Sequence, residues 1–330
     1  MNNLLSAPAR PEAPATERAG RRSRTEIIIV VVVVLAVLAA IVAGLSTPRF
    51  ATVANAKAII TSASLVGIAA LGLTLITIGG SAVSLAISPS VAAVGMIFLS
   101  AQSLGLAPAL VLAIAGGTLI TGLQGAVIGY AAANPVLLTI ATSFAIAGLA
   151  TGISGGETVS PTGTGYDRLN ATPGGVALSV YALVGLTLIL EWLLRRTAFG
   201  RTLYLIGENR RAAWTAGLPV GRTTTVAWLA AGALFAVTAA FTAAFNTSAN
   251  VNLGGTLTFD AIAAVLAGGT PISGGRGSAL RTLAGAVLIA AVSDILLLRG
   301  YSTGVQIMVK GLIVLIVVIL VHLHAKGRNA

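Results

Sequence analysis

Residues 27–45 read IIIVVVVVLAVLAAIVAGL, a run that contains no charged side chain. About 20 mainly apolar residues are enough for one helix to cross the hydrocarbon core of a bilayer. Arg21, Arg22 and Arg24 precede the run. A signal peptide has a shorter apolar region of about 7–15 residues, and TPR at 47–49 does not resemble its small-residue cleavage site. The run therefore predicts an uncleaved transmembrane helix.

The composition of the whole chain is that of a membrane protein. Of its 330 residues, 56% are hydrophobic and only 9% are charged, whereas about a quarter of a typical soluble domain is charged. A soluble globule of this length cannot bury so much apolar surface. The composition therefore excludes a soluble enzyme, a DNA-binding protein and a disordered chain. Cysteine is absent and the two histidines lie at the C-terminal end, so we expect no metal site.

Further apolar stretches follow the first one, separated by clusters of Gly, Pro, Asn and Ser. They predict an all-α polytopic membrane protein with about ten transmembrane helices. We expect a disordered cytoplasmic tail at 1–25, a transmembrane domain at 26–325 and a second tail at 326–330. The predicted spans are 27–45, 59–79, 84–104, 107–130, 135–154, 173–194, 223–245, a shorter one at 258–269, 279–298 and 304–323.

Positive side chains are distributed unevenly over the predicted loops. Lys and Arg favour the cytoplasmic side of a membrane protein, so their distribution predicts that both termini are inside. It also accounts for the pI of about 11.2 without a nucleic-acid partner, although anionic lipid headgroups would attract these side chains. The predicted cytoplasmic segments hold Arg10, Arg18, Arg21, Arg22, Arg24, Arg195, Arg196, Arg201, Arg210, Arg211, Arg222, Arg276, Arg281, Lys326 and Arg328, and the outer segments hold Arg49, Lys57, Arg168 and Arg299.

Two glycine clusters, at 79–81 and 268–277, fall where helices are predicted to end on the cytoplasmic side. Non-helical backbone at membrane depth must be buried in protein or line a watery cavity. The second cluster is too long for a simple turn, so it predicts a re-entrant or gating loop. An ordinary connection between helices is the alternative.

The loop at 195–222 is the one sizeable polar segment between predicted spans. Within it, Asn209 is a good N-cap, Gly217 suits the position after a helix, and Pro219 stops one. These residues predict a short isolated helix. Arg210 and Arg211 lie in its first turn, where the helix dipole disfavours cations. We expect an acidic partner surface or lipid headgroups to compensate them.

This loop resembles the cytoplasmic coupling loop of ribose-type ABC importer permeases, whose pattern is T-x-F-G-R-x-x-Y-x-I-G-x-N-x-x-A-A-x-x-x-G. The segment from Phe259 to Val265 and the glycines after it resemble a second hallmark, D-A-I-A-A-V-x-x-G-G followed by G-G-x-G. Asn134-Pro135 and Lys310-Gly311 also fit. The resemblance implies coupling to an ATPase through Gly200, Arg201, Asn209, Arg211, Ala212, Ala213 and Gly217, and a gate or pathway role for Phe259, Asp260, Gly268, Gly269, Gly274, Gly275, Asn134 and Ser84.

The resemblance further implies a type II-like ABC importer permease, a multi-pass protein of the inner cell membrane without catalysis or cofactor of its own. Its cargo would be a simple sugar or polyol. Its partners would be a cytoplasmic ATP-binding subunit, an extracytoplasmic solute-binding protein and a second copy of the chain. The sequence has no Walker A pattern, which agrees with ATP hydrolysis in a partner. The chain departs from the family pattern at Ala82, Ile128 and Arg211.

Ionisable side chains at membrane depth are functional by default. Asp294 and Lys310 lie on consecutive spans joined by a short turn, so we expect an intramembrane ion pair. Snorkelling to water and contact with the substrate are the alternatives for both side chains. Asp260 starts the short 258–269 segment, either as its N-terminal cap or as part of a gate. Glu191 and Arg195 are one turn apart and predict an interfacial pair.

Other functions remain open at this stage. A permease for nucleosides or branched-chain amino acids would share the same general design. An ion-coupled secondary transporter would need buried carboxylates, and Asp260 and Asp294 are the two that qualify. A membrane enzyme is disfavoured because no Ser/His/Asp, Glu/His or metal-binding set is predicted at membrane depth.

Overall fold

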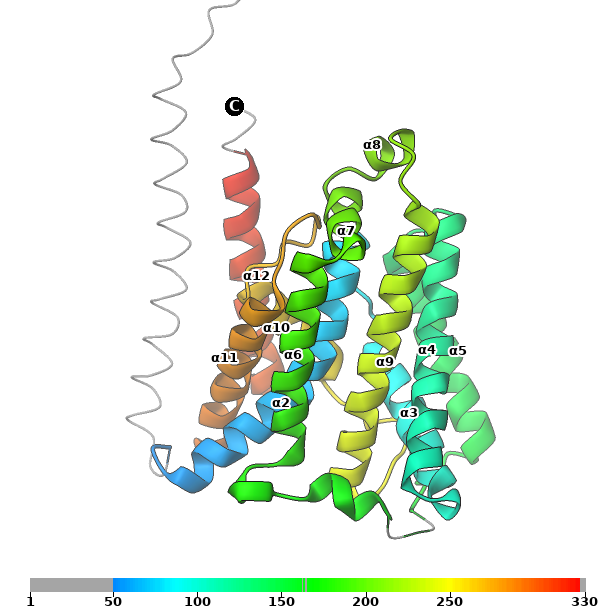
Figure 1. Ribbon diagram of the computed structural model, residues 1–330. Coiled ribbons are helices and arrows are strands. Elements are labelled where there is room, and N and C mark those ends of the chain that lie inside the picture. The colour runs from blue at the N-terminus through cyan, green and yellow to red at the C-terminus, as the bar shows by residue number, and fades with distance from the viewer. Residues whose placement is uncertain (1–49, 162, 164, 327–330) are drawn as a thin grey trace, which may run out of the picture.

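A computed structural model describes residues 50–161, 163 and 165–326 (Figure 1). Within these residues every regular element is a helix, apart from one isolated β-bridge between Val159 and Ala249. Seven helical stretches are long and apolar enough to cross a bilayer. They are α2 (Val53–Ile78), α3 (Ile87–Ser100) with the 3-10 turn η1 (Ala101–Leu104), α4 (Leu106–Tyr130), α5 (Pro135–Ser154), α6 (Leu178–Arg196), α9 (Val220–Asn246) and α11 (Ala279–Leu298).

The protein is thus an all-α polytopic membrane protein, as the sequence predicts, and its described residues hold seven long spans, whereas ten were expected over the whole chain. The predicted span at 27–45 lies outside the described residues. The predicted 258–269 segment forms the short helix α10 (Leu257–Ala267), and α12 (Thr303–Lys326) is the last helix. The predicted 173–194 span begins only at Leu178, because Pro173–Gly175 forms the 3-10 turn η3.

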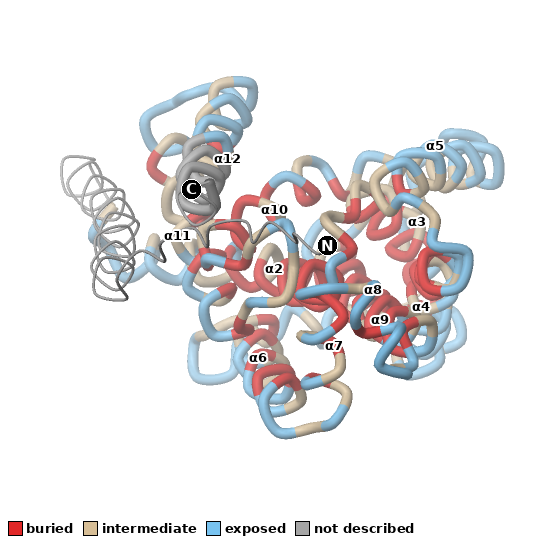
Figure 2. The backbone as a smooth tube through the Cα atoms, turned by 90° about the horizontal axis from the view of Figure 1, so that it is seen from above, coloured by how far each residue is buried: buried red, intermediate tan, exposed pale blue. Residues whose placement is uncertain are grey.

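Two helices, α2 and α9, form the centre of the molecule (Figure 2). Two thirds of each span, 67%, is buried, whereas 11% of α5 is. The large side chains Trp228 and Phe235 of α9 and Phe98 of α3 are fully buried there. The face of α5 that points away from this centre carries the exposed side chains Leu137, Phe144 and others, as a lipid-facing or partner-facing surface would.

Small residues let α4 and α9 pack with their backbones in contact. A Cβ atom added to Gly117 would lie 2.7 Å from the carbonyl oxygen of Gly232, and one added to Gly129 would lie 2.7 Å from the carbonyl oxygen of Gly221. Without a hydrophobic driving force between helices in lipid, such close packing is what holds them together. We therefore treat α4 and α9 as one rigid pair.

The short helices α3 and α10 meet at their N-termini. The backbone N–H of Ser88 donates to Oγ1 of Thr258 over 2.9 Å, and the N–H of Thr258 donates to Oγ of Ser88 over 3.0 Å. Each helix thereby satisfies one of the N–H groups that a helix start leaves without an internal partner. The segments 79–86 and 247–256 lead to these N-termini from opposite ends of the bundle (Figure 1).

The two ends of the bundle differ in character. At one end, which we call the α8 end, lie α7 (Ala198–Glu208) and α8 (Arg210–Thr215). The opposite end is covered by η2 (Gly165–Asn170) and η3 (Figure 1). The functional candidates therefore fall into two groups, one at the α8 end and one around the start of α10.

Candidate functional site

The loop at the α8 end consists of two capped helices. The Thr197 hydroxyl accepts from the N–H of Gly200 over 3.2 Å and begins α7, and the Asn209 side chain accepts from the N–H of Ala212 over 3.0 Å and begins α8. After α8, Gly217 has φ +77°, a left-handed conformation that favours glycine. The short helix predicted from these residues is present at its expected place.

The surface of α8 has one anchored side and one free side. Ala213 is buried against Ile206 and Val220, so it holds α8 to the body of the protein. Trp214 is 73% exposed, and Arg211 and Ala212 are exposed beside it. A large exposed aromatic next to a positive charge is typical of the centre of a protein interface.

Glycines fix the position of α7 in ways that only the structure shows. A Cβ atom on Gly200 would collide with the backbone of Leu194, so this candidate coupling residue is required for the turn between α6 and α7. Gly207 has the same constraint against the carbonyl oxygen of Ile78 at the end of α2. Sequence reasoning did not single out Gly207, although it is the glycine of the I-G-x-N part of the loop pattern. Arg201, another coupling candidate, is exposed on α7.

Arg210 lies in the first turn of α8 and reaches the end of α4. Its Nη2 donates to the carbonyl oxygens of Ile128 and Gly129 over 2.8 and 2.9 Å. Burial lowers the pKa of the Arg210 guanidinium. The charge of Arg210 is thus compensated within the chain, by the negative end of the α4 dipole. Arg211 is exposed.

The glycine cluster after α10 forms a loop that packs across the ends of α2 and α7. The N–H of Gly275 donates to the carbonyl oxygen of Ile78 over 3.0 Å, and the Tyr204 hydroxyl donates to the carbonyl oxygen of Gly277 over 2.9 Å. Burial raises the pKa of the Tyr204 phenol. The left-handed residues Gly269, Gly274 and Gly275 give the loop its course, and Gly268 packs against the backbone of Arg281.

A carboxylate holds the far end of that loop. Oε2 of Glu191 accepts from the N–H of Ala279 over 2.7 Å and from the Ser278 hydroxyl over 3.0 Å. The same carboxylate pairs with Arg195, which confirms the predicted interfacial pair. Glu191 thus caps the start of α11 from the end of α6, a second role that the one-turn spacing did not indicate.

The second group of candidates surrounds the start of α10. Nζ of Lys310 in α12 lies 2.7 Å from Oδ1 of Asp260, and the Thr256 hydroxyl donates to Oδ2 over 2.8 Å. Asp260 and Lys310 are both buried. Phe259 beside them is 58% exposed. This arrangement places a fully compensated charge pair at the junction of α10 and α12.

The expected pairing of Asp294 with Lys310 is wrong. Asp294, near the C-terminal end of α11, accepts instead from Nδ2 of Asn55 in α2 over 2.6 Å. The short turn between α11 and α12 suggested the pairing, but α12 packs mainly against α10, so its lysine faces Asp260. Sequence separation alone could not reveal that α12 packs mainly against α10.

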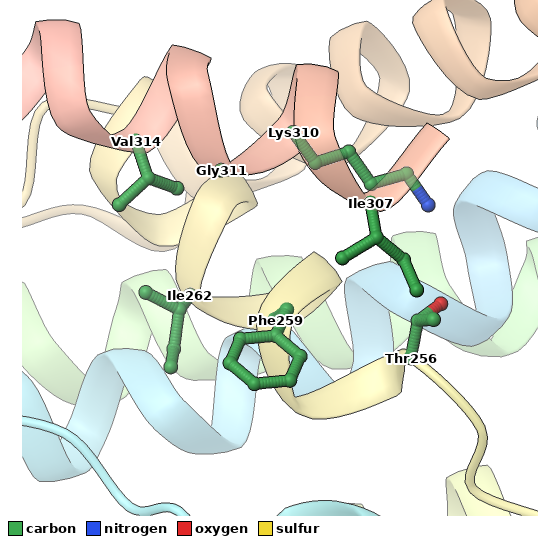
Figure 3. Close-up of a pocket in the computed structure, with 7 residues that line it drawn as sticks. All are labelled: Thr256, Phe259, Ile262, Ile307, Lys310, Gly311 and Val314. Carbon is green, nitrogen blue, oxygen red and sulfur yellow. The ribbon is translucent and has the colours of Figure 1, made fainter. Parts of the chain in front are cut away.

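A cavity of about 200 Å³ lies between α10 and α12 (Figure 3). The Lys310 side chain extends past Ile307 toward the end of the cavity where Thr256 lies. The walls are otherwise apolar, so they offer Asp260 and Lys310 no polar group that would compete with their ion pair. It is lined by Thr256, Phe259, Ile262, Ile307, Lys310, Gly311 and Val314.

Two further gate candidates, Ser84 and Asn134, lie at the loop before α3 and at the start of α5. Asn134 caps α5 by accepting from the N–H of Val136 over 3.0 Å, and Ser84 is buried. The N–H of Leu85 donates to the Thr139 hydroxyl over 3.2 Å, which joins this loop to α5. In the same loop Ala82 has φ +52°, a left-handed conformation that alanine adopts less readily than Gly, Asn or Asp.

Among the described residues, no group of three or more His, Cys, Asp or Glu side chains is arranged to hold a metal ion. Several polar side chains of both candidate groups instead bond to backbone or to one another, among them Asn209, Arg210 and Asp260. The arrangement suits conformational coupling between helices, in which caps, ion pairs and close glycine contacts keep separate elements in register.

Comparison with known proteins gives one family. The family described as "Branched-chain amino acid transport system / permease component" matches residues 55–321. The chain is 36% identical over 189 residues to the ribose import permease protein RbsC of Bacillus subtilis. This alignment covers 56% of the chain and 59% of that protein. It is 37% identical over 145 residues to the probable ABC transporter permease protein YphD of Escherichia coli, covering 44% of each.

A longer alignment exists to the autoinducer 2 import system permease protein LsrD of Yersinia enterocolitica. The identity is 30% over 273 residues, and the alignment covers 77% of the chain and 79% of that protein. The chain therefore spans about half the length of the first two relatives and most of the third.

Proposed function

The chain belongs to the permease-component family of branched-chain amino acid transport systems, and from this premise we propose that it is the permease subunit of an ABC importer for a simple sugar or polyol. One relative is named a ribose import permease protein. Its name supports a simple sugar or polyol as the solute over nucleosides and branched-chain amino acids. As a multi-pass protein, with seven long apolar helices in the part of the chain that the structure describes, it resides in the inner cell membrane.

The observation that carries the proposal is the surface of α8. Trp214 and Arg211 project from a helix whose other side is anchored by Ala213, so a force applied to the exposed side reaches the body of the protein. The ATP-binding subunit would dock there and supply the hydrolysis. The α8 end is then cytoplasmic, and both termini are on that side, as the distribution of Lys and Arg favours.

At the opposite end, the loop that carries Glu157 and Asp167 would receive the solute-binding protein. A second copy of the chain would complete the pathway, and the exposed apolar face of α5 offers it a surface. The family position of Phe259 and its 58% exposure support a pathway role. Asp260 is paired with Lys310 within the chain, so in an ion-coupled secondary transporter the other candidate carboxylate, Asp294, which accepts from Asn55, would have to carry the coupling ion.

The test is purification of the tagged chain from its native membrane in mild detergent, followed by identification of the bound proteins and by ribose uptake in proteoliposomes. We expect recovery of an ATP-binding subunit and uptake that depends on ATP. The variant Trp214→Ala should lose the subunit without loss of membrane insertion.

The matched control is Trp192→Ala, because Trp192 is 62% exposed on α6, outside the proposed docking helix. It should retain the ATP-binding subunit. Recovery of the chain alone from the wild type, with uptake driven by an ion gradient, would refute the proposal in favour of a secondary transporter.

A further inference from the structure

Arg210 joins two helices that are far apart in the sequence. It belongs to the first turn of α8, and its guanidinium donates to Ile128 and Gly129 in the last turn of α4. The last four carbonyls of a helix have no partner within it. Of these four in α4, the oxygens of Ile128 and Gly129 are the two that Arg210 occupies.

The charge of Arg210 has a reason to be at this place. At the start of α8 a cation opposes the helix dipole, whereas at the end of α4 it complements the dipole. A hydrogen bond from a charged donor is stronger than a neutral one, and half-burial of Arg210 limits the competition from water. The contact therefore links the two helices strongly, unlike a solvent-exposed contact on the protein surface.

The other end of α8 is joined to α9. A short connection, 216–219, leads from α8 into α9, and Ala213 packs on Val220 in the first turn of α9. The glycine contacts described above hold α4 and α9 together along their length. The C-terminal end of α8 is thus attached to this pair through residues 216–219, and its N-terminal end, which continues from α7 at Asn209, is attached to it through Arg210.

We infer that Arg210 is a positioning residue. Its contact with the end of α4 makes α4 and α9 move together with α8. The inference rests on the proposed function, because it takes the ATP-binding subunit as the source of motion. With both attachments intact, displacement of α8 carries α4 and α9 with it. Without the Arg210 contact, α8 keeps its links to α7 and α9, but its displacement no longer acts directly on the end of α4.

The first test uses the absence of cysteine from the chain. Cysteines placed at Val127 of α4 and Ala216 after α8, both exposed, accept spin labels for distance measurement by pulsed EPR. We expect one narrow distance distribution in the otherwise wild-type chain and a broad one with Arg210→Met. The control Arg196→Met removes an exposed arginine at the end of α6 and should leave the distribution narrow.

The second test separates coupling from folding in the transporter assembled with its ATP-binding subunit. Arg210→Met should lower ribose uptake about tenfold or more, the factor that corresponds to about one such hydrogen bond, while ATP hydrolysis persists. Arg210→Lys keeps the charge and should restore part of the uptake. A misfolded variant would lose hydrolysis and uptake together.

A narrow distribution in Arg210→Met, equal loss of hydrolysis and uptake, or unchanged uptake would overturn the inference. A wild-type chain that recruits no ATP-binding subunit would instead overturn the proposed function and, with it, the source of motion. The two failures are distinguishable because the second is seen without any Arg210 variant.

Discussion

At the scale of single residues, the ion pair between Asp260 and Lys310 places two charges inside the protein, and burial of a charge at membrane depth costs much free energy. A buried charge without its partner is strongly unfavourable, whereas removal of both charges is often tolerated. The pair joins α10 to α12, and Thr256 occupies the second carboxylate oxygen. We therefore expect the effects of Asp260 and Lys310 on stability to be coupled to each other much more than to those of neighbouring residues.

The prediction is a double-mutant cycle. Lys310→Met and Asp260→Asn should each lower the free energy of unfolding, by about 3–5 kcal/mol for the former, because each leaves one buried group unpaired. The double variant should recover most of the loss. Thermal unfolding in detergent measures this, with Asp294→Asn as the control. A double variant no more stable than Lys310→Met would show that the pair does not act as a unit.

Glu191 illustrates how one carboxylate can serve two elements. Its buried oxygens accept from the start of α11, while Arg195, its salt-bridge partner, is 64% exposed at the side chain. An exposed ion-pair partner contributes little, whereas a carboxylate that caps a buried helix start contributes more. The cap, and not the ion pair, is therefore the stabilising contact.

We accordingly predict that Glu191→Gln costs about 2–3 kcal/mol of unfolding free energy, because an amide cannot accept from all of these donors as a carboxylate does. Arg195→Gln should cost less than about 1 kcal/mol. Denaturant titration of the purified protein compares the two variants. Equal losses would mean that the ion pair is the contact that matters.

At the scale of elements, the sequence predicts what depends on local chemistry. Asn209 and Gly217 bracket α8 because capping and left-handed turns are properties of single residues. The apolar stretches predict the long spans for the same reason. The partners of Lys310 and Arg210 could not be predicted, because they depend on which helices pack together. In both cases the sequence showed a charge in need of compensation, without showing that α10 or the end of α4 supplies it.

One of the contacts that position α7 is that of Gly207 with the end of α2, and this gives a prediction. Gly207→Ala should displace α7 from the end of α2, because the added methyl group meets the carbonyl oxygen of Ile78. We expect loss of ATP-driven uptake and a lower melting temperature. The matched control is Gly185→Ala, whose added methyl group has nothing within 4 Å. That variant should be as stable as the wild type or slightly more so, and equal effects at both sites would argue against the contact.

At the scale of the whole molecule, the proposed orientation places the α8 end in the cytoplasm and η2 and η3 outside. The chain contains no cysteine, so single cysteines report the orientation without background. The exposed residue Ala216 directly follows α8, and the exposed residue Glu157 lies between α5 and η2, so the two belong to opposite ends of the bundle. They make a matched pair for this purpose.

We predict that a membrane-impermeant maleimide labels Glu157→Cys in intact cells and labels Ala216→Cys only after the membrane is permeabilised. The reason is the excess of Lys and Arg at the α8 end. Labelling of Ala216→Cys in intact cells would reverse the orientation and would remove α8 from the reach of a cytoplasmic ATPase.

The meeting of α3 and α10 at their N-termini also determines how the protein is made. A helix of 11 residues is about 16 Å long, roughly half of the hydrocarbon thickness, so α10 cannot be released into lipid as an independent span. Its first turn needs Ser88, synthesised earlier, and its aspartate needs Lys310, synthesised later. A membrane segment synthesised after α10, the helix α12, therefore completes this part of the interior of the protein. Premature termination before α12 removes the partner of Asp260 as well as the helix itself.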